Sequence, residues 1–277
     1  MEVGLFLTPD RALLRAAFPV SDKEEKFRVT EKELGKIDKG LPIPLYYQIS
    51  DILLQKITAQ EVRAHQQIPS EEKLAGVFEV SRLTVRQAIQ KLVNEEKLYR
   101  KRGHGTFVAE PKIERKVARL SSVAEDMERA GLKPGSVILE KKIILPKEEE
   151  RSVLGLKAEE KVLEMKRLRL ADHQPIAIGR SLIPVSLCPG LADETLVGVV
   201  SLTRFLAEKY GLRIGYAHQK IQAVNATTQQ AKLLKIKKGT SLLYMNRVFF
   251  TTDQDPIGIF ETFYRGDRYI FTSTLYP

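Results

Sequence analysis

Tryptophan is absent from this 277-residue chain, and cysteine occurs once, as Cys188. A lone cysteine cannot form a disulfide within the chain, which agrees with a reducing compartment. No stretch approaches the roughly 18 consecutive apolar residues that a membrane-spanning helix needs, and the first residues lack the basic start of a signal peptide. We therefore expect a cytoplasmic protein with no membrane partner.

The residue patterns of common catalytic and metal sites are also missing. The four histidines, His65, His104, His173 and His218, are scattered, and no two of them are spaced i, i+4 on a predicted helix. Neither a phosphate-binding P-loop nor a zinc-ligand spacing occurs, and Cys188 lies in "LCPG" without an obvious catalytic partner. Catalysis needs a poised acid, base, nucleophile or metal. We therefore expect no enzyme activity, no cofactor and no metal site.

Charge, in contrast, is abundant and unbalanced. The chain has 45 Lys and Arg against 35 Asp and Glu, for a formal net charge of +10. Such an excess favours an anionic partner. Most of it lies in residues 113–277, so the charge alone does not locate a DNA-binding surface.

The length suits two domains and a linker. We expect an N-terminal extension over residues 1–40, a first domain over 41–110, a charged connector over 111–117 and a second domain over 118–277. The extension mixes both signs of charge and ends in "GKIDKGLPIP", whose glycines and prolines are typical of a flexible segment. It is either a poorly ordered arm or a stretch read from an upstream start codon.

Three helices are predicted in the first domain. Pro44 suits the first position of a helix whose apolar residues recur at helical spacing from Leu45 to Ile57. Ser70 is the expected N-cap of a short helix. After a tight turn, Ser81 is the expected N-cap of a longer one.

The longer helix has two unlike sides. Its apolar stripe consists of Val85, Ala88, Ile89, Leu92 and Val93. The opposite side carries Arg82, Leu83, Arg86, Gln87 and Gln90. On its own this pattern is more typical of an ordinary solvated helix. A basic hairpin predicted at "GHG", after a short helix, a turn and a capped helix, favours instead a winged helix-turn-helix domain.

Residues 42–110 resemble the winged helix-turn-helix of GntR-type bacterial transcription regulators, through "PSE", "VSRLTVRQA" and "GHGTFV" in matching order and spacing. The resemblance implies that the recognition helix and the wing contact operator DNA through Ser81, Arg82, Thr84, Arg86, Gly103, His104 and Gly105. We extend this expected contact set to Ser70, Glu71, Lys73, Leu83, Gln87 and Arg102.

Two residues depart from the family pattern. Glu72 occupies a position where many members carry Arg, and Glu79 replaces the usual turn glycine. A non-glycine residue at position 79 costs about 1 kcal/mol if the backbone there is left-handed.

Arg82 and Arg86 lie four residues apart, on one side of the predicted helix. Both can therefore reach the major groove at once, where arginine reads guanine through two hydrogen bonds worth roughly 1–3 kcal/mol of discrimination. Lys91, Lys101 and Arg102 are expected to neutralise phosphates, which adds affinity without sequence information.

The second domain alternates strand and helix patterns. Strands rich in β-branched and aromatic residues are predicted at 136–145, 160–172, 174–184, 215–226, 241–253 and 257–276. Helices are predicted at 121–131, 146–156, 201–211 and 228–236. This mixture indicates an α+β fold with a largely antiparallel sheet.

From about residue 118 to 275 the chain resembles the UTRA effector-binding domain of the HutC subfamily of GntR-type regulators, whose fold is shared with chorismate lyase. The segments "LSSVAEDMERAGLKP", "SLTRFLAEKYGLRI" and "FYRGDRYIF" carry the resemblance. It implies a pocket for a small effector, often anionic or phosphorylated. The expected effector-binding residues are Ser121, Ser122, Arg167, Arg169, Arg180, Ser201, Thr203 and Tyr264.

The chemistry of these residues suits an anion. Arg167 and Arg169, two apart on a predicted strand, point to one face and can clamp a phosphate or carboxylate. Ser121 and Ser122 stand where a helix begins, so N–H and hydroxyl groups can hold an anion there. The alternatives are that the serines are only helix caps and that the arginines are only solvated.

Gly179 and Gly258 depart from the pattern of UTRA domains that bind amino-sugar phosphates, which commonly have carboxylates at these positions. Recognition of sugar hydroxyls by those acids is therefore not supported, and an effector of another class remains open.

Together these patterns predict a sequence-specific transcription regulator, a homodimeric repressor whose affinity for double-stranded operator DNA changes with a small anionic metabolite. Two alternatives remain: chorismate lyase-like catalysis in the second domain and non-specific nucleic-acid binding. A poised catalytic group would favour the first. Loss of binding in excess random DNA would favour the second.

Overall fold

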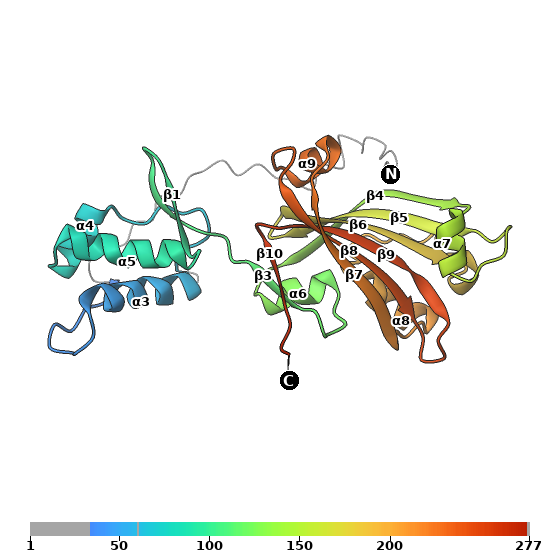
Figure 1. Ribbon diagram of the computed structural model, residues 1–277, viewed down its shortest axis with the longest axis horizontal. Helices are drawn as coiled ribbons and strands as arrows, with labels where there is room; N and C mark the ends of the chain where they lie inside the picture. Colours follow the sequence, from blue (N-terminus) through green and yellow to red (C-terminus); the bar gives the residue numbers. More distant parts are fainter. Residues whose placement is uncertain (1–33, 60, 276–277) are drawn as a thin grey trace. The chain divides into compact units, whose positions relative to one another are not determined.

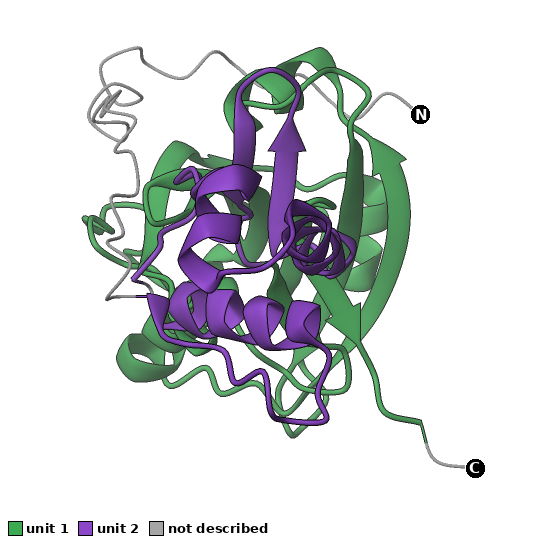
Figure 2. Ribbon diagram, turned by 90° about the vertical axis from the view of Figure 1, so that its left-hand side faces the viewer, with its two compact units in different colours: residues 1–20, 112–277 green, residues 21–111 purple. Residues whose placement is uncertain are grey.

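The computed structural model describes residues 34–59 and 61–275. The first 33 residues of the expected extension lie outside this described part. The described chain divides at residues 111 and 112 into two compact units, coloured separately in Figure 2. We call residues 34–111 (purple) the first unit and residues 112–275 (green) the second unit.

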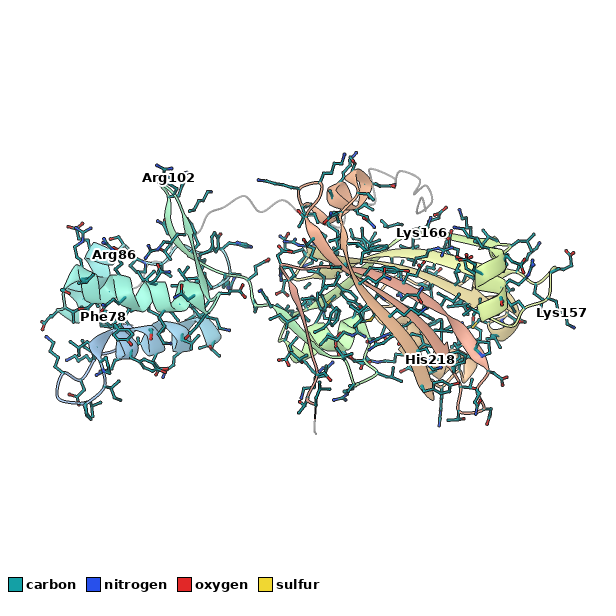
Figure 3. The ribbon with its side chains drawn as sticks, in the orientation of Figure 1. Phe78, Arg86, Arg102, Lys157, Lys166 and His218 are labelled. Atoms are coloured by element: carbon teal, nitrogen blue, oxygen red, sulfur yellow. The ribbon has the colours of Figure 1, made fainter. Side chains whose placement is uncertain are left out.

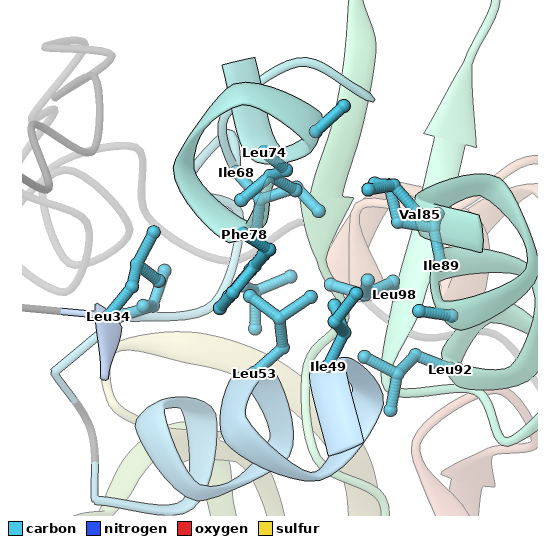
Figure 4. Packing of buried hydrophobic residues seen from close by; sticks show 14 residues of the cluster. Leu34, Ile49, Leu53, Ile68, Leu74, Phe78, Val85, Ile89, Leu92 and Leu98 are labelled. Carbon is cyan, nitrogen blue, oxygen red and sulfur yellow. The ribbon is translucent and has the colours of Figure 1, made fainter. Parts of the chain in front are cut away.

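The described residues of the first unit form three helices and a hairpin (Figure 1). The helices are α3 (Leu45–Thr58), α4 (Glu71–Phe78) and α5 (Arg82–Asn94), and the hairpin strands are β1 (Leu98–Lys101) and β2 (Gly105–Val108). One apolar cluster joins all of these elements, as Figure 4 shows. Its most buried members include Ile49, Leu74, Val85, Ala88, Ile89, Leu92, Leu98 and Val108. This is the core that the helical spacing predicts.

The helix caps agree with the sequence at two of three points. Ser70 and Ser81 are N-caps, and their hydroxyls accept the backbone N–H groups three residues later, at 3.2 and 3.1 Å. Pro44, expected as a first helical residue, is the N-cap of α3 instead, with an extended ψ of 135°. Glu79 is left-handed, with φ of 50°, so the turn before α5 carries the strain expected without glycine.

Residues just before α3 belong to this unit. Leu34 is 2% exposed and packs in the core cluster. The backbone N–H of Asp38 donates to Gln48 at 2.9 Å, and Gln48 donates back to the carbonyl of Asp38 at 2.9 Å. The expectation of a poorly ordered extension through residue 40 is therefore wrong for residues 34–40, because one leucine is buried against the helices.

The second unit is built on a six-stranded sheet of order β4-β5-β6-β9-β8-β7, in which every neighbouring pair is antiparallel. The strands are β4 (Pro134–Ile144), β5 (Val162–Ala171), β6 (Gln174–Pro184), β7 (Tyr216–Asn225), β8 (Ser241–Phe250) and β9 (Pro256–Arg265). This confirms the α+β class and the antiparallel sheet.

The register of the strands assigns side chains to two faces. One row of facing residues defines the cavity face: Arg167, Gly179, Thr262 and Met245. The adjacent row defines the outer face: Lys166, Arg180, Glu261 and Asn246. Neighbouring residues on a strand therefore place their side chains on opposite faces of the sheet.

Within residues 112–275, four helices accompany this sheet: α6 (Val123–Arg129), α7 (Glu148–Val153), α8 (Leu202–Tyr210) and α9 (Thr228–Leu234). A 3-10 turn lies at Val185–Leu187. α6 and α8 lie over the cavity face, where Met127 clusters with Tyr264 and Leu206 clusters with Met165. α9 lies over the outer face, where its Leu234 packs in the cluster of Leu168.

A short two-stranded sheet closes the second unit. β3 (Ile113–Lys116) pairs in parallel with β10 (Tyr269–Thr272). The segment expected as a charged connector, 111–117, therefore contains a strand, and the strand predicted at 257–276 is two strands. Ile113 is fully buried. The sequence around it has no helical or alternating pattern long enough to predict strand β3.

Candidate functional site

The polar side of α5 is exposed, as its sequence predicts. Val85, Ala88, Ile89 and Leu92 on the opposite side are at most 1% exposed. The exposed side carries Arg82, Leu83, Arg86 and Gln87. Leu83 is 63% exposed, so a large apolar side chain stands in solvent between two arginines. Such a surface offers both bidentate donors and an apolar contact to base edges.

Two glutamates of α4 hold the arginines in the absence of a partner. Arg86 Nε donates to Glu71 at 2.9 Å, and Arg100 of β1 lies 3.4 Å from the other oxygen of Glu71. Arg82 lies 3.8 Å from Glu72. Both arginines of α5 are more than half exposed, and exposed ion pairs contribute only about 0–1 kcal/mol. The arginines can therefore exchange these partners at little cost.

Two hydrogen bonds stabilise the turn of the hairpin. The N–H of His104 donates to the carbonyl of Lys101 at 2.9 Å, which closes the turn. Gln67 Nε2 donates to the carbonyl of His104 at 2.7 Å. A Cβ atom on Gly105, whose φ is 117°, would lie 2.4 Å from that same nitrogen. Glycine at position 105 is thus required by its backbone angle, and a Cβ atom there would also displace the Gln67 amide from its hydrogen bond with His104.

Figure 3 shows Arg102 at the tip of this hairpin and Arg86 on the side of α5 away from α3. All the DNA-contact residues expected from the sequence lie in the first unit and are exposed or half-buried: Ser70, Glu71, Lys73, Ser81, Arg82, Leu83, Thr84, Arg86, Gln87, Arg102, Gly103, His104 and Gly105. Three of them also have structural roles. Ser70 and Ser81 cap helices, and Glu71 accepts a hydrogen bond from Arg86.

The second unit contains a cavity of about 370 Å³ between the cavity face of the sheet and the helices α6 and α8. Six of the eight effector residues expected from the sequence line it: Ser121, Ser122, Arg167, Arg169, Thr203 and Tyr264. Ser201 is not among the lining residues. It caps α8 by accepting the N–H of Arg204 at 3.3 Å.

Arg180 was expected in the pocket, and the structure contradicts this. It lies on the outer face, where its guanidinium contacts Glu150 and Glu164 at 2.7 Å and Glu261 at 2.9 Å. Burial alone would lower the pKa of Arg180, but the hydrogen bonds that it donates to the three glutamates raise its pKa overall. The physical reason is the strand period of two, which turns Gly179 toward the cavity and Arg180 away from it.

Arg167 and Arg169 are the most unusual groups of the cavity wall. They are 5% and 8% exposed, which contradicts the alternative that they are solvated. Arg169 donates to the carbonyl of Val200 at 2.7 Å and lies 3.3 Å from Ser136. Arg167 has no hydrogen-bond or ion-pair partner within the described part of the chain. Burial lowers the pKa of Arg169 to about 10, and burial together with the charge of Arg169 lowers that of Arg167.

Two further buried arginines, Arg115 and Arg247, line the wall, and the sequence did not single them out. Arg115 of β3 is 1% exposed and forms an ion pair with Asp126 at 2.8 Å, and it donates to the Tyr264 hydroxyl at 2.8 Å. Arg247 of β8 donates to Gln219 at 2.9 Å and to the carbonyl of Ser121 at 3.3 Å. Burial raises the pKa of Asp126, although Arg115 lowers it.

The serines at the start of α6 are occupied within the protein. Ser121 donates to Asp126 at 2.8 Å. Ser122 caps α6 and donates to Glu125 at 3.0 Å. The cap role left open by the sequence therefore holds for Ser122, while both residues also line the cavity. Within the described residues, no cluster of three or more His, Cys, Asp or Glu side chains could hold a metal.

The cavity arginines divide into neutralised and unneutralised groups. Arg115 has Asp126, and Arg204 of α8 lies 3.8 and 3.7 Å from Glu125 and Glu128. Arg167 and Arg169 have no carboxylate partner among the described residues. The cavity wall at β5 is therefore positively charged and suited to a small anion.

Comparison with known proteins agrees with both halves of the chain. Residues 45–108 match the family model of "Bacterial regulatory proteins, gntR family", and residues 129–270 match that of the UTRA domain. The HTH-type transcriptional repressor NagR of Bacillus subtilis is 37% identical over 235 residues, which cover 85% of this chain and 96% of the relative. A probable fructoselysine utilization operon transcriptional repressor of Escherichia coli is 31% identical, covering 82% of this chain and 93% of the relative.

Solved structures give the same answer. The crystal structure of PhnF from Mycobacterium smegmatis superposes with a TM-score of 0.66 and 27% identity, over 84% of this chain and 99% of PhnF. No helix of the described residues is both long and apolar enough to cross a bilayer. The curated relatives are transcriptional repressors rather than enzymes, which leaves the lyase alternative without support. The chain belongs to the GntR family of bacterial transcription regulators and joins a winged helix-turn-helix domain to a UTRA effector-binding domain.

Proposed function

We propose that the exposed side of α5 enters the major groove of operator DNA while the hairpin tip reaches the adjacent groove. Support comes from the arrangement of Arg82 and Arg86, whose helix buries its entire opposite side. Leu83 between them offers an apolar contact to thymine methyl groups. Arg102 at the hairpin tip is exposed and suits a phosphate or minor-groove contact.

On DNA the two α4 glutamates must release their arginines. Glu71 lies between Arg86 and Arg100, so it holds both guanidinium groups near α5 before DNA arrives. Its role in this proposal is to orient arginines rather than to contact phosphates, because a carboxylate is repelled by the DNA backbone. Ser81 and Thr84, at the exposed start of α5, complete the surface with hydroxyl groups.

A competition gel shift tests this surface. The full chain is mixed with labelled DNA that flanks its own gene and with increasing unlabelled random duplex, at fixed salt. We expect Arg82→Ala to lose most of the discrimination between the two, about 1–3 kcal/mol or up to roughly 100-fold. Lys101→Ala is the control, since loss of a phosphate contact weakens binding to both DNAs alike. Unchanged discrimination in the Arg82 variant would count against this surface.

We propose further that the cavity binds a small anionic effector, with Arg167 and Arg169 as its main ligands. The observation that carries this is a buried guanidinium, Arg167, without a partner among the described residues. An uncompensated buried charge is costly, and an anion in the cavity removes that cost. Isothermal titration of the full chain with inorganic phosphate tests the idea. Arg167→Ala should weaken phosphate binding while effector-free DNA affinity stays nearly the same.

The regulator is proposed to act as a homodimeric repressor in the cytoplasm. Its relatives in Bacillus subtilis and Escherichia coli are named as repressors. Two copies on a pseudo-palindromic site convert the modest affinity of one winged domain into tight binding. Sedimentation velocity at micromolar concentration tests the dimer, and a single monomer species bound at one half-site would contradict it.

A further inference from the structure

The cavity wall changes character along the strands. Near Arg167 and Arg169 it is polar, with Tyr264 and Thr262 beside them on the cavity face. Two residues further along β9 lies Phe260, and four residues from Met245 along β8 lies Phe249. Arg247, opposite Phe260 in the strand register, also lines the cavity, but its guanidinium donates to Gln219 and to the carbonyl of Ser121. At about 3.3 Å per residue, these rings lie roughly 7 and 13 Å from the arginine row.

The aromatic end is closed by other apolar side chains. Phe249 and Phe260 pack edge to face, with ring centroids 4.8 Å apart. The remaining apolar lining at this end comes from α8 and the loop after it, through Ala207, Leu212 and Ile214. A Cβ atom on Gly258, in the row of Phe249, would lie 2.5 Å from the carbonyl of Leu182 and 3.1 Å from the Phe260 ring. Without a backbone shift, no polar side chain fits at position 258.

Hydrogen-bond acceptors for ligand hydroxyls are scarce. Arginine donates only, and within the described lining there is no Asp, Asn, Gln or His. Five lining hydroxyls can accept as well as donate, but those of Ser121, Ser122 and Tyr264 already bond to Asp126, Glu125 and Arg115. This leaves the hydroxyls of Thr203 and Thr262. The one carboxylate, Glu125, already accepts from Ser122 and lies 3.8 Å from Arg204. A sugar brings several hydroxyl donors, each of which costs free energy when buried without an acceptor.

We infer that the effector is an anionic group attached to an apolar ring or chain, such as an aryl or alkyl phosphate or carboxylate, rather than a polyhydroxylated sugar phosphate. This rests on the proposed anion site at Arg167 and Arg169. The anionic group replaces the missing partner of Arg167, and the apolar part reaches Phe260 and Phe249. Arg213 at the same end is exposed, so water screens its charge and it imposes no second anionic group. A volume of about 370 Å³ suits a ligand of this size.

Calorimetric titration of the full chain with three probes tests the inference. The probes are inorganic phosphate, phenyl phosphate and glucose 6-phosphate. We expect phenyl phosphate to bind about 10-fold or more tightly than inorganic phosphate, because one face of its ring leaves water. Glucose 6-phosphate should bind no more tightly than inorganic phosphate.

Variants at the apolar end separate this inference from the anion site. Ala207→Phe fills the apolar end and should remove the advantage of phenyl phosphate while inorganic phosphate binds as before. Ala207→Ser is the matched control that keeps the space. If the phenylalanine does not fit the fold, Leu212→Asn, in the loop after α8, should reduce the same advantage by adding a polar group.

Three results would decide against us. Glucose 6-phosphate binding more tightly than phenyl phosphate overturns the ligand class and leaves the anion site intact. An unchanged advantage of phenyl phosphate in the Ala207→Phe and Leu212→Asn variants overturns the location of the apolar subsite. Absence of binding by all three probes, or binding that Arg167→Met leaves unchanged, overturns the proposed anion site itself.

Discussion

Replacement of Arg167 by methionine should make the effector-free protein more stable and abolish its anion binding. Arg167 is 5% exposed and has no partner among the described residues, so its charge is desolvated without compensation. Methionine keeps a similar unbranched stem and fills much of the same volume. The two properties move in opposite directions because the charge is harmful to folding and useful for binding.

The size of the effect follows from the geometry. Arg167 and Arg169 lie two residues apart on one face of β5, roughly 7 Å, and like charges at that distance repel by about 2 kcal/mol at an effective dielectric constant of about 20. Burial adds to this. Burial lowers the pKa of Arg169 from its ordinary value to about 10, which corresponds to about 3 kcal/mol of penalty on the charged form.

The free-energy penalty on the charged form of Arg169 depends on pH. A base whose folded-state pKa is lowered is penalised at every pH below that pKa, and the penalty fades as the pH rises from about 10 toward the pKa of the unfolded state. At neutral pH it is therefore fully present. Removal of Arg167 should relieve about 2 kcal/mol there, since the repulsion from Arg169 disappears.

Thermal unfolding followed by circular dichroism provides the measurement. For a domain of this size, about 2 kcal/mol raises the midpoint by roughly 4–8 °C. Titration with inorganic phosphate should show no binding to the variant. A midpoint below that of the wild type, or unchanged phosphate affinity, would refute the idea of an uncompensated charge in the cavity.

Arg180→Met is the matched control from the other face of the same sheet. This arginine contacts Glu150, Glu164 and Glu261. Its removal leaves three carboxylates without their common partner, which should cost about 3 kcal/mol. Phosphate affinity should stay the same, because Arg180 does not line the cavity. Replacement of Arg167 would thus stabilise the protein, and replacement of Arg180 would destabilise it.

Two further predictions concern the DNA-binding unit. Gly105→Ala should weaken DNA binding by about 10-fold or more, because its φ of 117° disfavours a Cβ atom and Gln67 stands 2.4 Å from that position; Gly76→Ala, an exposed helical site with open space, is the control, and normal binding by the Gly105 variant would contradict a required hairpin geometry. Ser81→Ala should lose about 1 kcal/mol of stability with the α5 cap, whereas Ser81→Asp should keep the cap but bind DNA more weakly through repulsion of phosphates; equal DNA affinity of the aspartate variant in a gel shift would remove Ser81 from the contact surface.

The winged domain could be read from the sequence because local patterns specify it. Ser70 and Ser81 precede helices whose apolar spacing closes a single core, and short-range caps and periodicity depend on neighbours within one or two turns. Glu79 occupies the position of the turn glycine in the family pattern, and its left-handed φ of 50° is the conformation that a glycine there implies. The contact surface followed as the side of α5 left over after the core was assigned.

The residues that line the cavity could be identified only from the pairing of the strands. Arg167 and Arg169 could be placed on one face by their spacing, but spacing does not say which face is covered by helices. Arg180 was misplaced because that decision rests on the register of β6 against β5 and β9. Arg115 looked like part of a charged connector, and only its pairing partner β10, more than 150 residues away, turns its side chain into the cavity.

Residue types and spacings thus determined the local structure: two serine caps, the apolar stripes of three helices, a glycine-containing hairpin and the strand-forming residues of the sheet. Long-range contacts decided which arginines lost water, which found carboxylates and which were left with neither. The reason is physical. Helix and turn preferences act between near neighbours in the chain, whereas desolvation and ion pairing depend on segments that meet only after the sheet has assembled.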